Sequence, residues 1–108
     1  MKLMIDTSGY VFDTTSKPLA AKEDENGIQR RERGTDRLLW VVQLNADHPD
    51  GAEAINVTVA GERPKLTARQ SVVVTGLEAV PWKDRRTGEI RMSWRAASIV
   101  AASAVKAA

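Results

Sequence analysis

Five segments of this chain have the apolar pattern of β-strands, four alternating with a period of two and residues 38–46 apolar on both faces before they alternate, which limits what the chain can fold into more than any other feature. The segments are residues 2–13, 38–46, 54–60, 71–80 and 90–99. A period of two places successive side chains on opposite faces of a β-strand, whereas a helix needs apolar residues three and four positions apart. The pattern therefore predicts an all-β protein with five strands.

In two of these segments the alternation changes phase at a glycine. In residues 2–13 the apolar positions are odd before Gly9 and even after it, and in residues 71–80 they are even before Gly76 and odd after it. Such a phase change indicates a bulge or a sharp bend in a strand. Because bent strands let a small sheet close on itself, we expect a small five-stranded OB-type barrel. An SH3-like barrel and a small open sandwich are the alternatives.

The polar segments between the predicted strands are residues 14–37, 47–53 and 61–70, and the last contains a short helix or coil. Residues 14–37 are strongly charged and predict a long first loop, or a two-stranded ribbon that turns at Asn26-Gly27. Gly88 favours a tight turn between the last two strands. We expect one barrel domain, residues 1–100, followed by an alanine-rich tail, residues 101–108, that is frayed or disordered.

The residues that usually carry catalysis or bind metals are scarce in this chain. It has no cysteine and one histidine, His48, in a turn-like sequence at residues 47–51. No phosphate loop, nucleophile elbow or metalloprotease pair is present. We therefore expect no enzymatic activity, no cofactor and no metal site. With neither a signal-peptide pattern nor an apolar run of membrane-spanning length, the expected location is cytoplasmic.

Residues 81–96 concentrate aromatic and basic side chains in the last predicted hairpin. They hold two of the three tryptophans, five basic residues and two acidic ones, a local net charge of +3 against −1 for the rest of the chain. The basic residues are Lys83, Arg85, Arg86, Arg91 and Arg95. A protein that binds single-stranded nucleic acid needs cations for the phosphates and flat side chains for the bases. The hairpin therefore predicts a nucleic-acid-binding surface, with ordinary solvated charges as the alternative.

The aromatic residues divide by their expected positions. Trp82 follows a proline at the end of a strand. It therefore lies where the hairpin leaves the barrel, and there it either stacks on a nucleobase or caps the barrel. Strand parity places Trp94 on the apolar face, opposite to the arginines of the same strand, and Trp40 lies in an apolar run. We expect Trp94 and Trp40 in the core. Tyr10 either packs or stacks on a base.

A second basic cluster lies in the long predicted loop. It consists of Arg30, Arg31 and Arg33. In an OB-type barrel the first loop and the last hairpin flank the same nucleic-acid-binding face. We therefore expect these arginines to close over the strand that the hairpin binds.

The stretch from residue 38 to residue 99 resembles small proteins of actinobacterial plasmids and integrative elements, some of them activators of replication, integration and excision. The resemblance rests on LLWVVQLNAD, PKLTARQSVVVTGLEAVPW and RTGEIRMSWRAASI. The arrangement is more weakly similar to the OB-fold single-stranded-DNA-binding proteins of filamentous phages. The resemblance implies a role in processing the DNA of a mobile element.

Residues and resemblance together predict a non-catalytic protein that binds single-stranded DNA during replication or transfer of a plasmid or mobile element. A homodimer would gain affinity from two linked sites. The alternative is an OB-fold adaptor that docks a replication or transfer protein, with Trp82 as an interface anchor. A regulator that binds duplex DNA is disfavoured, because the sequence has no helix-turn-helix pattern.

Overall fold

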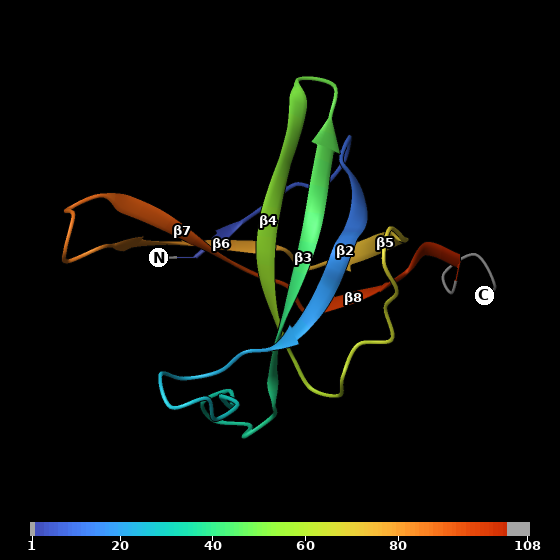
Figure 1. The fold of residues 1–108 in the computed structure, drawn as a ribbon. Coiled ribbons are helices and arrows are strands. Elements are labelled where there is room, and N and C mark those ends of the chain that lie inside the picture. Colours follow the sequence, from blue (N-terminus) through green and yellow to red (C-terminus); the bar gives the residue numbers. More distant parts are fainter. Residues whose placement is uncertain (1, 104–108) are drawn as a thin grey trace.

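The computed structural model describes residues 2–103, which form one curled β-sheet of eight strands (Figure 1). The strands are β1 Leu3–Met4, β2 Val11–Ala21, β3 Leu39–His48, β4 Gly51–Ala60, β5 Ser71–Thr75, β6 Glu78–Lys83, β7 Ile90–Arg95 and β8 Ser98–Ala101. Their order across the sheet is β1-β6-β7-β4-β3-β2-β5-β8. Neighbouring strands are antiparallel except β4 and β7, which are parallel. The prediction of an all-β fold is confirmed.

The eight strands differ from the five predicted, because three of the predicted strands are each divided in two. Gly9 lies in the turn between β1 and β2, which pair with different strands. Gly76, with a φ of 65°, separates β5 from β6. Residues 96 and 97 separate β7 from β8. Glycine reaches positive φ at little cost, so both glycines mark changes of chain direction and not bulges within one strand.

The predicted end of the first strand at residue 13 is wrong, since β2 continues to Ala21. The register of β2 against β3 shifts between Thr14 and Leu19, and pairing resumes where Leu19 faces Val42. Pro18 lies in the shifted part. Proline has no backbone N–H to donate, so it interrupts the ladder without ending the strand. The charged first loop is therefore residues 22–38 and not 14–37.

A second tight hairpin, which the sequence analysis missed, joins β3 to β4. His48 pairs with Gly51, so residues 49 and 50 alone form the turn. Most of the predicted polar link 47–53 therefore belongs to the two strands. The link 61–70 adopts coil and a turn, which is one of the two expected conformations.

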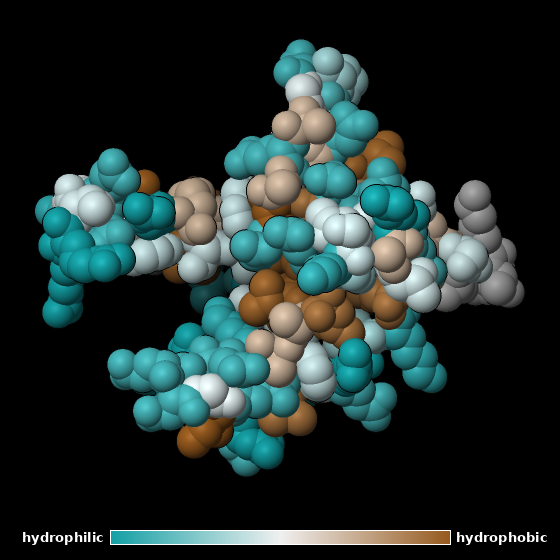
Figure 2. Space-filling view, in the orientation of Figure 1, coloured by the Kyte–Doolittle hydropathy of each residue, from teal (hydrophilic) through white to brown (hydrophobic). Residues whose placement is uncertain are grey.

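The core consists of side chains from β2, β3, β4, β5 and β8 and from the links that join β5 to β6 and β7 to β8. Its buried members are Phe12, Val42, Leu44, Ala46, Ile55, Val57, Val59, Val72, Val74, Leu77, Ala96 and Ile99. Trp40 and Trp94 are half-buried and pack against this core, which confirms their predicted positions. Apolar side chains accordingly gather at the centre of the molecule in Figure 2, and polar side chains cover its projecting parts.

The outer parts of β6 and β7 leave the core as a two-stranded arm, residues 80–93, which projects from the sheet in Figure 1. β4 pairs with β7 only at Trp94 and Arg95, so nothing on the β4 side covers the rest of β7. Ile90 and Met92 share the predicted face of Trp94 but are 68% and 42% exposed. On this face of β7, Trp94 is therefore covered by the core, whereas Ile90 and Met92 are exposed.

The predicted tail, residues 101–108, lies mostly outside the described residues. Ala101 belongs to β8, so the tail does not begin there, and residues 104–108 are not described. Within residues 2–103 no helix is both long and apolar enough to cross a membrane.

Candidate functional site

One face of the β6–β7 hairpin carries both a tryptophan and two arginines. Trp82 lies opposite Arg91, and Glu78 lies opposite Arg95, in the antiparallel register of β6 and β7. Residues opposite each other, and residues two apart in one strand, share a face. Trp82, Arg91 and Arg95 therefore lie on one face, and Trp82 is 45% exposed. The predicted separation of the two arginines from the face of Trp94 is confirmed.

Lys83 belongs to the opposite face of the arm. It lies across from Ile90, on the side that also carries Met92 and Trp94. The five basic residues of the hairpin therefore do not form one footprint. Arg85 and Arg86 lie in the exposed turn at the tip of the arm, from which either face can be reached.

Asp84 organises that turn from a buried position. Its carboxylate accepts a hydrogen bond from the backbone N–H of Arg86, at 2.9 Å, and lies 3.1 Å from Nε of Arg91. The backbone N–H of Gly88 donates to the Asp84 carbonyl at 2.7 Å. Nη2 of Arg91 also lies 3.6 Å from Glu89. Arg91 is thus already paired with two carboxylates, which reduces the charge that it offers to a ligand.

The charged loop, residues 22–38, is folded by its own hydrogen bonds. Its outer part turns at Asp24, whose side chain accepts from the backbone N–H groups of Asn26 and Ile28 at 2.8 and 3.0 Å. Single bridges join Glu23 to Gln29 and residue 31 to residue 38. The loop is therefore closer to the predicted ribbon with a turn at Asn26-Gly27 than to an open loop, although only isolated bridges pair its two sides.

The three loop arginines lie close to the ends of β2 and β3. The backbone N–H of Arg30 donates to the Lys22 carbonyl at 2.7 Å, and its carbonyl accepts from Leu39 at 3.0 Å. Nη1 of Arg31 donates to the Asp36 carbonyl at 3.0 Å. These bonds hold the basic part of the loop against the sheet beside the base of the arm.

A cleft of about 500 Å³ separates this loop from the base of the arm, and Figure 2 shows the recess between the two projecting parts. It is lined by Lys2, Arg30, Arg31, Glu32, Arg33, Leu39, Glu78 and Arg95. Five of these residues are basic and two are acidic. The structure therefore brings the three loop arginines together with Arg95, but not with Lys83, Arg85 or Arg86, which do not line the cleft.

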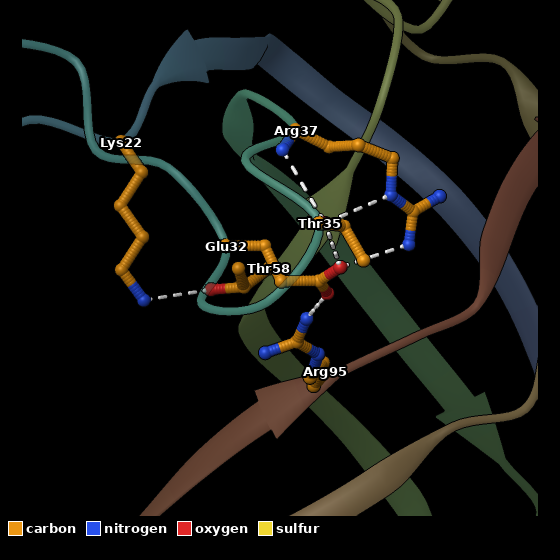
Figure 3. Close-up of polar contacts among 6 residues, drawn as sticks. All are labelled: Lys22, Glu32, Thr35, Arg37, Thr58 and Arg95. Atoms are coloured by element: carbon orange, nitrogen blue, oxygen red, sulfur yellow. Dashed lines mark hydrogen bonds and ion pairs between the residues drawn. The ribbon is translucent and has the colours of Figure 1, made fainter.

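Glu32 joins the loop to the arm through a shared carboxylate (Figure 3). Its Oε1 accepts hydrogen bonds from Nη2 of Arg37 at 3.0 Å and from the hydroxyl of Thr35 at 2.6 Å. Its Oε2 accepts from Nη2 of Arg95. The Glu32 side chain is only 15% exposed. One carboxylate thus neutralises part of the charge of two arginines.

Lys22 adds a further cation beneath the cleft. Its Nζ donates to the hydroxyl of Thr58 on β4 at 2.9 Å (Figure 3). Burial lowers the pKa of Lys22 below its ordinary value, and the positive charges of Arg30 and Arg95 lower this pKa further. Lys22 is therefore close enough to Arg30 and to Arg95 to be repelled by both. Such an arrangement favours binding of an anion, which would relieve the repulsion.

The remaining candidates lie away from the cleft. Tyr10 packs against Phe12 and His48, with ring centroids 5.9 and 4.8 Å away, and it does not line the cleft. Nδ1 of His48 lies 3.5 Å from Asp50. Within the described part of the chain, no three His, Cys, Asp or Glu residues are grouped so that they could hold a metal ion.

The sequence analysis missed several residues of the site. They are Lys2, Lys22, Glu32, Arg37, Thr58 and Glu78. The sequence around Glu32 could have indicated its role, because a single acidic residue between Arg31 and Arg33 is well placed to pair with arginines. Thr58 and Glu78 had no such signal, because only the pairing of β7 with β4 and β6 brings them beside Arg95.

The chain was compared with protein-family models, curated proteins and solved structures. No family model, no curated protein and no solved structure matches it significantly.

Proposed function

We propose that this protein binds single-stranded DNA, without catalysis, along the cleft between the charged loop and the arm. The observation that carries the proposal is the convergence of Arg30, Arg31 and Arg33 with Arg95 around one cleft. Neutralisation of phosphates by such cations supplies most of the affinity of a protein for a nucleic-acid backbone. A lining of five cations and two carboxylates favours a polyanion over a neutral or cationic ligand.

Trp82 supports a single strand over a duplex. It shares a face of the β6–β7 hairpin with Arg95, and the residue is 45% exposed. The bases of a single strand expose their faces and stack on aromatic rings, whereas the bases of a duplex are already stacked on one another. Trp82 does not line the cleft, but an exposed indole on the same face of the hairpin as Arg95 favours a ligand with unpaired bases.

We further propose that the curled sheet is an OB-type barrel. Joining β5 to β6 and β7 to β8 across their corners leaves five long strands and the two-residue β1. The pairings of these strands form a closed ring, in which β2 pairs with β3 and β5, and β4 pairs with β3 and β7. In such a barrel the loop after the first strand and the loop between the last two strands flank the ligand face. These loops correspond here to residues 22–38 and 84–89.

A titration with matched oligonucleotides tests the DNA-binding proposal. Wild-type protein is titrated with a single-stranded oligothymidylate and with a duplex of the same length, read by tryptophan fluorescence. We expect tighter binding of the single strand and quenching of Trp82. If four or five phosphates are neutralised, the affinity should fall about 50- to 100-fold between about 50 and 200 mM salt.

Two double variants that each lose two positive charges separate the cleft from general electrostatics. Arg30→Ala with Arg33→Ala removes two cations of the cleft, and Lys17→Ala with Lys65→Ala removes two exposed cations that do not line it. The first variant should flatten the salt slope by about one to one and a half, whereas the second should leave it nearly unchanged. Equal weakening by both variants would contradict a binding site in the cleft.

One observation favours a second function, that of a protein-docking adaptor. Ile90 and Met92 are 68% and 42% exposed on the face of the arm opposite Trp82. Exposed apolar side chains on a projecting element are typical of interaction surfaces. The two functions differ in their response to salt: an apolar interface keeps its affinity as the salt concentration rises, whereas binding to phosphates weakens steeply.

A further inference from the structure

We propose that Glu32 is an internal competitor for phosphate: it holds Arg95 and Arg37 in the free protein, and the phosphates of a bound strand displace it. The site would then select a strand with several phosphates over an isolated phosphate. This inference rests on the proposed function, since it concerns the same cleft.

The contacts of Glu32 are those of an anion in a binding site. Its carboxylate accepts from Arg37, Thr35 and Arg95, and its side chain is 15% exposed. Arginine binds carboxylate and phosphate through the same planar set of N–H donors. Glu32 also lines the cleft directly. In the free protein its carboxylate therefore occupies a position that a phosphate of the strand can use.

Glu78 provides a second partner for Arg95 when Glu32 leaves. The two residues are opposite each other on β6 and β7, which places their Cβ atoms about 5 Å apart. One carboxylate oxygen of Glu78, Oε2, is buried and has no hydrogen-bond partner within residues 2–103. A buried acceptor without a donor is costly. Arg95 can thus pair either with Glu32 on the loop or with Glu78 on its own hairpin. When it pairs with Glu78, Arg95 no longer holds the loop.

The charge balance explains why a strand can displace Glu32. Burial lowers the pKa of Lys22, and the positive charges of Arg30 and Arg95 lower it further, while five cations and two carboxylates line the cleft itself. A strand brings several phosphates and releases condensed counterions from each of them. An isolated phosphate must compete with Glu32, which is already held close by the loop. A strand with several phosphates therefore displaces Glu32 more readily than an isolated phosphate does.

Binding measurements on Glu32→Gln test this inference. The control is Glu25→Gln, which removes the same charge from an exposed position on the same loop that does not line the cleft. With an oligothymidylate of about twelve nucleotides, a length within the usual range of one site, Glu32→Gln should bind about five- to tenfold more tightly than wild type. Glu25→Gln should stay within about twofold. Inorganic phosphate, titrated alone, should gain more than the oligonucleotide does, about twentyfold or more in affinity for Glu32→Gln over wild type, because the isolated phosphate no longer competes with Glu32.

Thr35→Val is a milder variant for the case in which Glu32→Gln does not fold. It removes one donor to Glu32 and keeps both arginines, so affinity should rise about twofold. If wild type binds the oligonucleotide, but Glu32→Gln binds no more tightly than Glu25→Gln, this inference fails and the proposed function stands. If Thr35→Val folds and Glu32→Gln does not, an affinity of Thr35→Val equal to that of wild type likewise means that this inference fails and the proposed function stands. Absence of binding by wild type and variants alike overturns the proposed function and this inference with it.

Discussion

Trp82 and Trp94 lie on the same hairpin but have different surroundings. Trp94 faces Ala79 on β6 and packs against the core, whereas Trp82 faces Arg91 on the projecting arm and is 45% exposed. The difference arises because β4 pairs with β7 only at Trp94 and Arg95. We therefore expect Trp94 to contribute to the stability of the fold and Trp82 to contribute to ligand binding.

Trp94→Ala should destabilise the protein more than Trp82→Ala does. Loss of the half-buried ring of Trp94 should reduce the free energy of unfolding by about 2–4 kcal/mol, because a cavity replaces contacts with the core. Trp82→Ala should change it by less than about 1 kcal/mol. Thermal unfolding of both variants measures the difference. A larger loss of stability in Trp82→Ala would mean that the arm folds back onto the core.

The charged loop illustrates how an element without regular strands can still be structured. Asp24 holds its outer turn, and Arg30 and Glu32 tie its second half to Lys22, to β3 and to β7. Its residues are nevertheless mostly exposed, and few apolar side chains anchor it. Elements of this kind open locally at low cost.

Limited trypsin digestion should cut the free protein in this loop, and single-stranded DNA should protect it. We expect the first cut after Arg33, because Nη1 of Arg31 is engaged with the Asp36 carbonyl and the backbone of Arg30 pairs with Lys22 and Leu39. Mass spectrometry of the fragments identifies the sites.

A cut at Arg69 serves as the control in the same digest. Arg69 is exposed in the link between β4 and β5 and does not line the cleft. Its rate of cleavage should not change when DNA is added. If DNA slows the cuts at Arg33 and Arg69 equally, the loop is not part of the binding site.

At the scale of the whole molecule, the sheet curls where two corners of the chain touch. Gly76 joins β5 to β6, and residues 96 and 97 join β7 to β8. A Cβ on Gly76 would lie 3.1 Å from the Cβ of Ala97. The backbone N–H of Ala96 donates to Thr58 and that of Ala97 to Thr75, so the second corner links β4 to β5. The curl therefore depends on close approach at Gly76.

Gly76→Ala should destabilise the fold more than Gly88→Ala. Both glycines have positive φ, 65° and 75°, so each substitution carries a backbone strain of about 1–2 kcal/mol. Nothing lies within 4 Å of a Cβ on Gly88, whereas one on Gly76 crowds Ala97. Gly76→Ala should therefore lose about 1–3 kcal/mol more, measured by chemical denaturation. Equal losses would show that the two corners do not pack closely.

The sequence alone determined the features that depend on one strand at a time. Alternation predicted the all-β class, and in the alternating segment 54–60 the apolar positions Ile55, Val57 and Val59 are buried. Parity also separated Arg91 and Arg95 from the face of Trp94. These features are local, because the side chains of any β-strand alternate between two faces whatever the strand pairs with.

The tertiary structure alone decided what covers each face and which charges meet. Strand ends depend on which neighbouring strands accept the backbone hydrogen bonds. This holds for the breaks at Gly9 and at residues 96–97 and for the continuation of β2 past Pro18. The ion pair between Glu32 and Arg95 joins residues 63 positions apart. Ile90 has the parity of a core residue but is exposed, because its strand extends beyond the layer that would cover it. Alternation carries no information about register between distant segments, and register decides both burial and charge pairing.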